Sequence, residues 1–285
     1  MSIAFIGGGN MATALIVGML KKGRRPQEIH VVDIEHEARE RLAREQHVST
    51  SAAMDAQLHG AECIVLAVKP QNMRDVARGL APFLRAPLVI TIAAGVRYAD
   101  LSRWLGGHTR IVRAMPNTPA LALAGVTGLY APASVSKDDR NRAEQILGAA
   151  GSTLWVETEE EIDAVTAVSG SGPAYVFYFI EALQEAAVDL GFSPDAARLL
   201  ALETFRGAVK LAVESPEPPA TLRARVTSKG GTTERAIAEL ERSGVRKAIL
   251  KAARAAAGRS RELGIALGAD SANDAPIDNN KGTPR

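Results

Sequence analysis

The stretch that decides the fold is Ser2-Ile-Ala-Phe-Ile-Gly-Gly-Gly-Asn-Met-Ala12. It is a short apolar run that enters a glycine turn, and residues 15–20 then repeat apolar side chains at helical spacing up to Gly23. The turn matches the pattern Gly-x-Gly-x-x-Ala. Its first glycine permits a tight turn, its second lets the backbone approach a pyrophosphate, and its alanine allows close packing of helix on sheet. The stretch therefore predicts a strand, a dinucleotide-binding turn and a helix.

A second predicted strand, Ile29–Val32, ends at Asp33, which lies 21 residues after Ala12. An acidic residue at this distance ordinarily binds the ribose hydroxyls of the adenosine. Such a carboxylate favours NAD over NADP because it repels a 2′-phosphate, although Arg39 and Arg41 on the next helix would weaken that preference. The alternative interpretation makes Asp33 the N-cap of that helix.

Strands and helices go on alternating to about residue 156. The expected strands cover residues 62–68, 88–92, 110–114, 125–130 and, at the sheet edge, 152–156. This order predicts a parallel, doubly wound sheet, in which ligands bind beyond the carboxyl ends of the strands. The unusual peptides of this half fall at such ends and predict one continuous cleft: Gly7–Ala12, Lys69-Pro70, Ala93–Gly95 and Asn117-Thr118.

From about Glu159 the pattern is helical throughout. We therefore expect a sheet domain over residues 1–158, a helical domain over residues 159–268, and a disordered polar tail over residues 269–285. The helix expected at Ala174–Leu190 begins with seven residues that leave it no polar face. Such a helix needs burial all round, so we expect a partner subunit.

A second glycine loop, Val226-Thr-Ser-Lys-Gly-Gly-Thr-Thr233, also leads into a helix. The unpaired amides and the dipole at a helix start suit a small anion such as a carboxylate or a phosphate. Ser228, Thr232 and Thr233 add hydroxyl groups. The alternative is an ordinary capped helix start.

Composition argues against several classes of protein. A net charge of +2 predicts no nucleic-acid partner, and no apolar stretch is long enough to span a membrane. We also expect no secretory leader. The single cysteine, Cys63, lies in an apolar run and predicts a buried, inert thiol in a reducing, cytoplasmic setting.

The histidines lie within the first 108 residues and away from the expected strand ends, so neither a Ser-His-Asp relay nor a metal site is expected. Without an evident base, deprotonation of an alcohol is poorly supported. Hydride addition to a protonated C=N bond needs mainly positioning and the relay of one proton. An anion cradle with a hydroxyl group supplies both.

Six peptides together resemble pyrroline-5-carboxylate reductases: Phe5–Ala12, Ala67–Pro70, Ala93–Gly95, Met115–Pro119, Ser169–Tyr175 and Val226–Thr233. The similarity covers about residues 2–265. It implies reduction of 1-pyrroline-5-carboxylate to L-proline, the last step of proline synthesis, with NADP or NAD. It also implies an α/β fold in which a Rossmann-type sheet precedes an all-helical, substrate-binding and dimerisation domain. A homodimer, or a ring of dimers, would result.

The resemblance further implies the residues of the site. The cofactor would lie along Ile6, Gly7, Gly8, Gly9, Asn10, Met11, Asp33, Ala67, Val68, Lys69, Pro70, Ile92, Ala93, Ala94 and Asn117. The substrate carboxylate would bind at Ser228, Gly230, Gly231, Thr232 and Thr233, with the Thr233 hydroxyl facing the ring nitrogen as the catalytic group.

Two features depart from the family pattern. Lys229 replaces the usual proline, which loosens the loop by about 0.4–1 kcal/mol and brings a cation near the substrate carboxylate. The family generally prefers NADPH, whereas Asp33 favours NADH.

Two other functions fit the dinucleotide turn. β-Hydroxyacid dehydrogenases share the plan but carry a lysine with an asparagine one turn on, and Ala174–Glu185 contains neither. A regulator that senses dinucleotides would have no reason to keep the Gly-Gly-Thr-Thr cradle.

Overall fold

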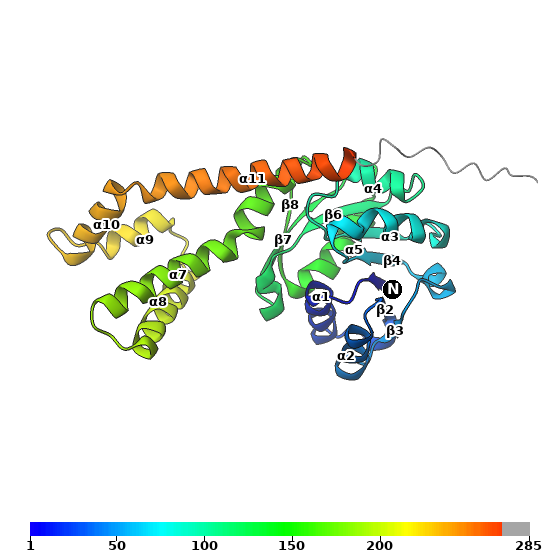
Figure 1. The fold of residues 1–285 in the computed structure, drawn as a ribbon, viewed down its shortest axis with the longest axis horizontal. Coiled ribbons are helices and arrows are strands. Elements are labelled where there is room, and N and C mark those ends of the chain that lie inside the picture. The colour runs from blue at the N-terminus through cyan, green and yellow to red at the C-terminus, as the bar shows by residue number, and fades with distance from the viewer. Residues whose placement is uncertain (270–285) are drawn as a thin grey trace, which may run out of the picture. The chain divides into compact units, whose positions relative to one another are not determined.

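A computed structural model of the chain describes residues 1–269, which form two compact units (Figure 1). Of the described residues, the sheet unit contains 1–170 and 256–269, and the helical unit is Ser171–Ala255. This division lies later than residue 158, where the sequence placed its boundary. The expected tail lies outside the described residues, except for Ala269, which ends the last helix.

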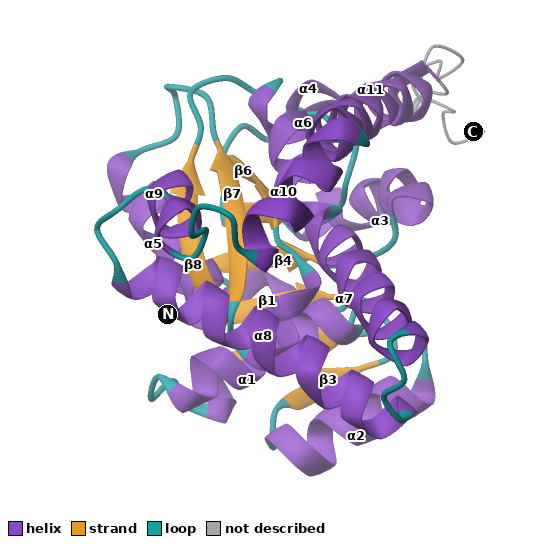
Figure 2. Cartoon of the chain, turned by 90° about the vertical axis from the view of Figure 1, so that its left-hand side faces the viewer, coloured by secondary structure: helices purple, strands orange, loops and turns teal. Residues whose placement is uncertain are grey.

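One eight-stranded sheet forms the centre of the sheet unit, with the strand order β3-β2-β1-β4-β5-β6-β7-β8. Figure 2 shows these strands side by side. Their bounds are β1 Ile3–Ile6, β2 Ile29–Val32, β3 Ser49–Ser51, β4 Cys63–Leu66, β5 Leu88–Thr91, β6 Ile111–Met115, β7 Gly125–Tyr130 and β8 Gly151–Trp155.

The doubly wound sheet is confirmed, with two differences from the expected strands. β7 runs antiparallel to β6, because only a short 3-10 turn, Thr118–Ala122, joins them and no crossover helix carries the chain back. β3 was not expected, because its sequence Ser-Thr-Ser has no apolar pattern. It pairs with β2, and the two ring nitrogens of His30 lie 2.9 and 3.1 Å from the hydroxyl oxygens of Ser49 and Ser51.

Alternate residues of β1 enter two cores, one on each face of the sheet. Ile3 and Phe5 pack with the first core, and Ala4 and Ile6 pack with the second. The first core includes residues of α1 Asn10–Lys21, α2 His36–Gln46 and α5 Lys137–Leu147, and the second includes residues of α3 Met73–Leu80 and α4 Tyr98–Trp104. Helices on both faces are the arrangement that a parallel sheet requires.

Two acidic residues, the buried Asp163 and the partly buried Glu159, connect later parts of the chain to the sheet unit. Asp163, on α6 Glu161–Val165, accepts hydrogen bonds of 2.7 Å from Arg97 and from Ser260 on α11 Val245–Ala269. Glu159 pairs with the buried Arg113 of β6 and accepts a hydrogen bond from the amide of Tyr98. These contacts explain why α6 and the end of α11 belong to the sheet unit.

The helical unit contains α7 Gly172–Asp189, α8 Pro194–Glu214, α9 Pro219–Arg225, α10 Thr232–Arg242 and the start of α11. The helix expected at Ala174–Leu190 is confirmed, beginning two residues earlier. Several of its apolar side chains are left exposed by the described residues, since Phe177 is 66% exposed and Tyr178 is 69% exposed. Among the described residues, no helix is long and apolar enough to cross a membrane.

Candidate active site

The carboxyl ends of four parallel strands lie at one level of the sheet. Ile6 pairs in register with Val32 and with Leu66, and Leu66 pairs with Thr91. The residues that follow these four are Gly7, Asp33, Ala67 and Ile92, which the sequence placed in the cofactor site. The segments that the sequence assigned to one cleft therefore begin along one edge of the sheet.

The glycine turn sits at the centre of this edge. Gly7 has a φ of +100°, and a side chain there would meet the carbonyl oxygen of Ala67 at 2.7 Å. Gly9 is exposed, and a Cβ atom on it would meet nothing within 4 Å. As the N-cap of α1, Gly9 also has no side chain that caps the first amides of the helix. The turn therefore leaves both space and hydrogen-bond donors for a pyrophosphate.

Two further predicted segments follow β4 and β5, on one side of the turn. Ala67 donates its amide to the carbonyl of Ile6, and Ile92 donates to the carbonyl of Leu66, so both segments continue directly from their strands. Lys69 is exposed and precedes Pro70, which starts a short 3-10 turn. The resemblance assigns these residues, with Val68, Ala93 and Ala94, to the cofactor, and they follow strands that end at the same edge of the sheet as the glycine turn.

Asn117 lies at the same edge but has its side chain bound within the protein. Its Nδ2 donates to the carbonyl of Ser169 at 3.1 Å, and its Oδ1 accepts from the amide of Val126 at 2.9 Å. Only 8% of the residue is exposed. A contact of Asn117 with the nicotinamide stays a prediction, and the observed bonds fix the loop that carries it.

Asp33 is not the N-cap of α2, which is Glu35. Its carboxylate instead accepts the amide of Gly8 at 2.5 Å and the amide of Glu35 at 2.8 Å. Next to it, Ile34 is 82% exposed at the open edge. Ile34 is not among the site residues expected from the sequence. An apolar side chain directly after the acidic residue at a strand end was the available signal for a surface on which a cofactor could pack.

In the helical unit, the loop Ser228–Thr233 turns into α10. Gly230 has a φ of +74° and donates its amide to Glu234 at 2.7 Å, and the Gly231 amide donates to the carbonyl of Ser228 at 3.0 Å. Two of the amides expected to hold the substrate carboxylate are thus bound within the chain. Thr232 and Thr233 are the first two residues of α10, whose N-cap, Gly231, supplies no side-chain bond.

Two histidines and the cysteine of the sheet unit have pKa values that burial shifts toward the uncharged form. Burial lowers the pKa of His30 and of His108, which keeps both rings neutral at physiological pH. Burial raises the pKa of the Cys63 thiol far above its ordinary value, which makes it an inert core residue. Over residues 1–269, no three or more His, Cys, Asp and Glu side chains form a group that could hold a metal ion.

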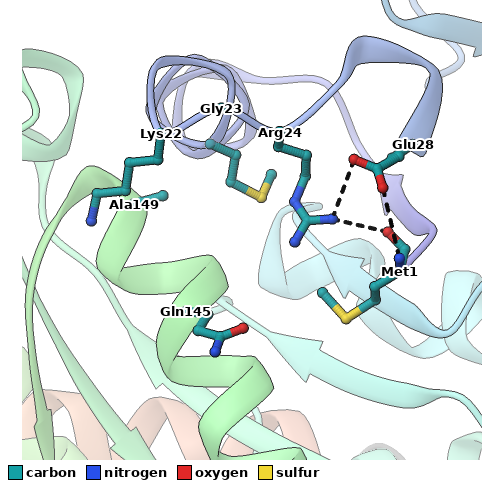
Figure 3. Close-up of a pocket in the computed structure, with 8 residues that line it drawn as sticks. Met1, Lys22, Gly23, Arg24, Glu28, Gln145 and Ala149 are labelled. Carbon is teal, nitrogen blue, oxygen red and sulfur yellow. Dashed lines mark hydrogen bonds and ion pairs between the residues drawn. The ribbon is translucent and has the colours of Figure 1, made fainter.

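A separate pocket of about 530 Å³ lies at the amino ends of the strands (Figure 3). Met1, which precedes β1, lines it, as do Arg24 and Glu28, which precede β2. The amino group of Met1 lies 3.7 Å from Glu28, and Arg24 lies 3.8 Å from the same carboxylate. This pocket is therefore at the opposite edge of the sheet from the glycine turn.

The fold and the open glycine turn define a Rossmann-type dinucleotide-binding protein. A family model described as pyrroline-5-carboxylate reductase dimerisation matches residues 159–263, and one described as NADP oxidoreductase, coenzyme F420-dependent, matches residues 2–95. The pyrroline-5-carboxylate reductase of Pseudomonas aeruginosa is 45% identical over 267 residues, covering 93% of this chain and 98% of the relative. The chain belongs to the pyrroline-5-carboxylate reductase family.

Other relatives agree with this assignment. The enzyme of the same name from Haemophilus influenzae is 42% identical, covering 92% of this chain and 97% of the relative. The structure of a pyrroline-5-carboxylate reductase from Coxiella burnetii superposes with a TM-score of 0.87 at 43% identity, covering 92% and 98% of the two chains. A Plasmodium falciparum pyrroline carboxylate reductase, solved with NADP bound, gives 0.82 at 27% identity, covering 93% and 98%.

Proposed function

We propose that the two glycine loops serve the reaction for which the family is named. The chain is an NAD(P)H-dependent oxidoreductase that reduces 1-pyrroline-5-carboxylate, a cyclic imine, to L-proline in the last step of proline synthesis. The observation that supports the cofactor half of this assignment is the row of four strand ends in register, with the uncapped glycine turn among them.

NAD(P)H, which supplies the hydride when bound, would be held by the residues of that edge. The amides of Asn10 and Met11, at the start of α1 next to the open Gly9, have no side-chain cap and would hold the pyrophosphate. Ile34 offers exposed apolar surface for the adenine. The segments Ala67–Pro70 and Ile92–Ala94 would line the rest of the cofactor's path.

The substrate carboxylate would bind at the start of α10. The amides of Gly230 and Gly231 already donate hydrogen bonds to Glu234 and Ser228. The donors that this loop offers to a carboxylate are therefore the amides of Thr232 and Thr233 and the nearby hydroxyls. The helix dipole adds partial positive charge at this end. Thr233 is half-buried, whereas Thr232 is exposed, which favours Thr233 as the residue that faces the ring.

The chemistry asks little of the protein beyond orientation. The nitrogen of the C=N bond carries its proton before reduction, so the protonated imine and one hydride added at its carbon give the ring amine, and charge and atoms balance. A hydroxyl group at Thr233 would orient the ring nitrogen and hydrogen-bond to it through this change. No histidine or metal ion is required by this scheme.

The helical unit would pair subunits, as the name of its matching family model indicates. An apolar cavity of about 370 Å³ within this unit, lined by Tyr175, Tyr178 and Phe179 from α7 and by residues of α11, fits the side chains of a second copy. A ring of dimers and a cytoplasmic location stay predictions from the sequence.

The test is oxidation of NADPH or NADH at 340 nm with 1-pyrroline-5-carboxylate, together with measurement of L-proline formed. We expect turnover in the wild type and its near-complete loss in Gly9→Glu, because the new carboxylate fills the open space and repels the pyrophosphate. Gly79→Glu is the matched control, since Gly79 is also exposed with nothing within 4 Å of an added Cβ. A wild type without oxidation of either cofactor would contradict the proposal.

A further inference from the structure

All four polar atoms of Asp33 have partners within the protein. Its amide donates to the carbonyl of Ser51 at 3.1 Å, and its carbonyl accepts from the Arg39 guanidinium at 2.8 Å. Of its two carboxylate oxygens, Oδ2 accepts from the Gly8 amide at 2.5 Å and Oδ1 accepts from the Glu35 amide at 2.8 Å. Hydrogen bonds from amides to a charged carboxylate are among the stronger ones in proteins.

The bond to Gly8 reaches the middle of the glycine turn from a residue 25 positions away. Gly8 is also packed tightly against side chains of α2 and β2, because a Cβ atom on it would lie 2.7 Å from Leu42 and 3.3 Å from Val31. Gly8 directly precedes Gly9, whose open side we assign to the pyrophosphate. A shift of the Gly8 peptide would therefore move the donors that hold the pyrophosphate.

Two arginines bind backbone carbonyls of Asp33 and of its neighbours. Arg39 donates to the carbonyls of Asp33 and Ile34 at 2.8 and 2.9 Å, and Arg41 donates to the carbonyl of Gly8 at 3.3 Å. Helix α2, which carries Arg39 and Arg41, also carries the exposed acids Glu37 and Glu40, and Glu40 pairs with His36. The guanidiniums of Arg39 and Arg41 would offset part of the repulsion that the Asp33 carboxylate would exert on a 2′-phosphate.

Resting on the function proposed above, we infer that Asp33 is a positioning residue of the pyrophosphate turn and does not select between NADH and NADPH. A carboxylate that binds the adenosine ribose contacts its 2′ substituent, which is a hydroxyl in NADH and a phosphate in NADPH. A carboxylate that holds the Gly8 peptide acts on the pyrophosphate turn, which both cofactors use. Loss of a ribose-binding carboxylate would change the ratio of kcat/KM for NADPH to kcat/KM for NADH, whereas loss of a carboxylate that positions the turn would lower both values alike.

The experiment measures kcat, KM and the dissociation constant of NADPH and of NADH for the wild type, Asp33→Asn and Asp33→Ala. We expect both cofactors to bind about tenfold more weakly in Asp33→Ala, as for loss of a hydrogen bond to a charged group, with kcat little changed. Asp33→Asn, which keeps one acceptor oxygen, should fall between. The NADPH to NADH ratio of kcat/KM should stay within about twofold of the wild type.

Asp55→Ala is the matched control, because Asp55 accepts the amide two residues on, from Gln57, as Asp33 does from Glu35, but has no bond to the glycine turn. It should leave both dissociation constants unchanged. If Asp33→Ala does not fold, Asp33→Asn decides the question. A roughly tenfold or larger shift of the ratio toward NADPH, with binding lost for NADH alone, would overturn the inference. A wild type that binds both cofactors but reduces no substrate would instead contradict the proposed function, and the binding ratios would still test Asp33.

Discussion

At the scale of the residue, several polar groups have hydrogen-bond partners that could not be predicted from the neighbouring sequence. Asp33 was interpreted from its distance to the glycine turn, either as a ribose ligand or as a helix N-cap. In the structure, the Asp33 carboxylate accepts hydrogen bonds from the amides of Gly8 and Glu35. In the same way, Gly230 and Gly231 belong to the expected anion cradle, yet their own amides bind Glu234 and Ser228.

Thr233 gives the prediction at this scale. Thr233→Val, which keeps the side-chain shape but removes the hydroxyl, should lower kcat roughly a hundredfold, because the hydroxyl acts on the ring nitrogen during reduction. The affinity for NADPH should change little. Steady-state kinetics and direct cofactor binding measure the two effects.

Thr233→Ser restores the hydroxyl and should recover most of the turnover. Thr227→Val is the control within the same loop, because the Thr227 hydroxyl is already bound to the carbonyl of Arg223. Equal losses of kcat and of cofactor affinity in Thr233→Val would argue against the placement of this residue at the substrate.

At the scale of the element, the regular helices and strands were largely foreseen. The strands expected at 29–32 and 125–130 have the bounds of β2 and β7, and the helix expected at 174–190 lies within two residues of α7. Their apolar patterns are local signals. The antiparallel direction of β7 and the pairing of the polar β3 depend on the sheet and could not be seen in the segments themselves.

Asp163 gives the prediction at this scale. It is fully buried and joins α6 to Arg97 and to Ser260 of α11. Asp163→Ala should lower the free energy of unfolding by about 3 kcal/mol, because it leaves the largely buried Arg97 without its partner. Denaturant unfolding followed by circular dichroism measures this change.

The matched control is Glu262→Ala, on the same α11. Glu262 pairs with Arg259, and both side chains are about two-thirds exposed. Its loss should cost less than about 1 kcal/mol. If the two variants unfold alike, the buried pair does not anchor α6 and the end of α11.

At the scale of the whole molecule, the apolar surface of the helical unit decides the oligomeric state. Exposed apolar residues gather on its helices, among them Phe177, Tyr178, Leu199, Val209, Leu211 and Val213. Surfaces of this kind on a folded chain mark protein interfaces. This agrees with the dimerisation family that matches residues 159–263.

Light scattering after size exclusion should therefore give at least twice the 30.1 kDa of one chain. A ring of dimers would give a larger even multiple. Phe177→Asp should shift the protein toward the monomer, because it buries an unpaired charge in the interface. Leu154→Asp, an equally apolar exposed site on β8 of the sheet unit, should leave the mass unchanged. A monomeric wild type would refute the interface.

The sequence by itself determined the Rossmann-type sheet, the glycine turn, the helical second half and the family. These follow from apolar periods, turn residues and short motifs, which are properties of neighbouring residues. Only the tertiary structure decided the partners of Asp33, Asp163 and Glu159, the direction of β7, and the assignment of α6 and the end of α11 to the sheet unit. Those depend on residues far apart in the chain, and a polar side chain has many possible partners until the backbone has brought one of them within about 3 Å.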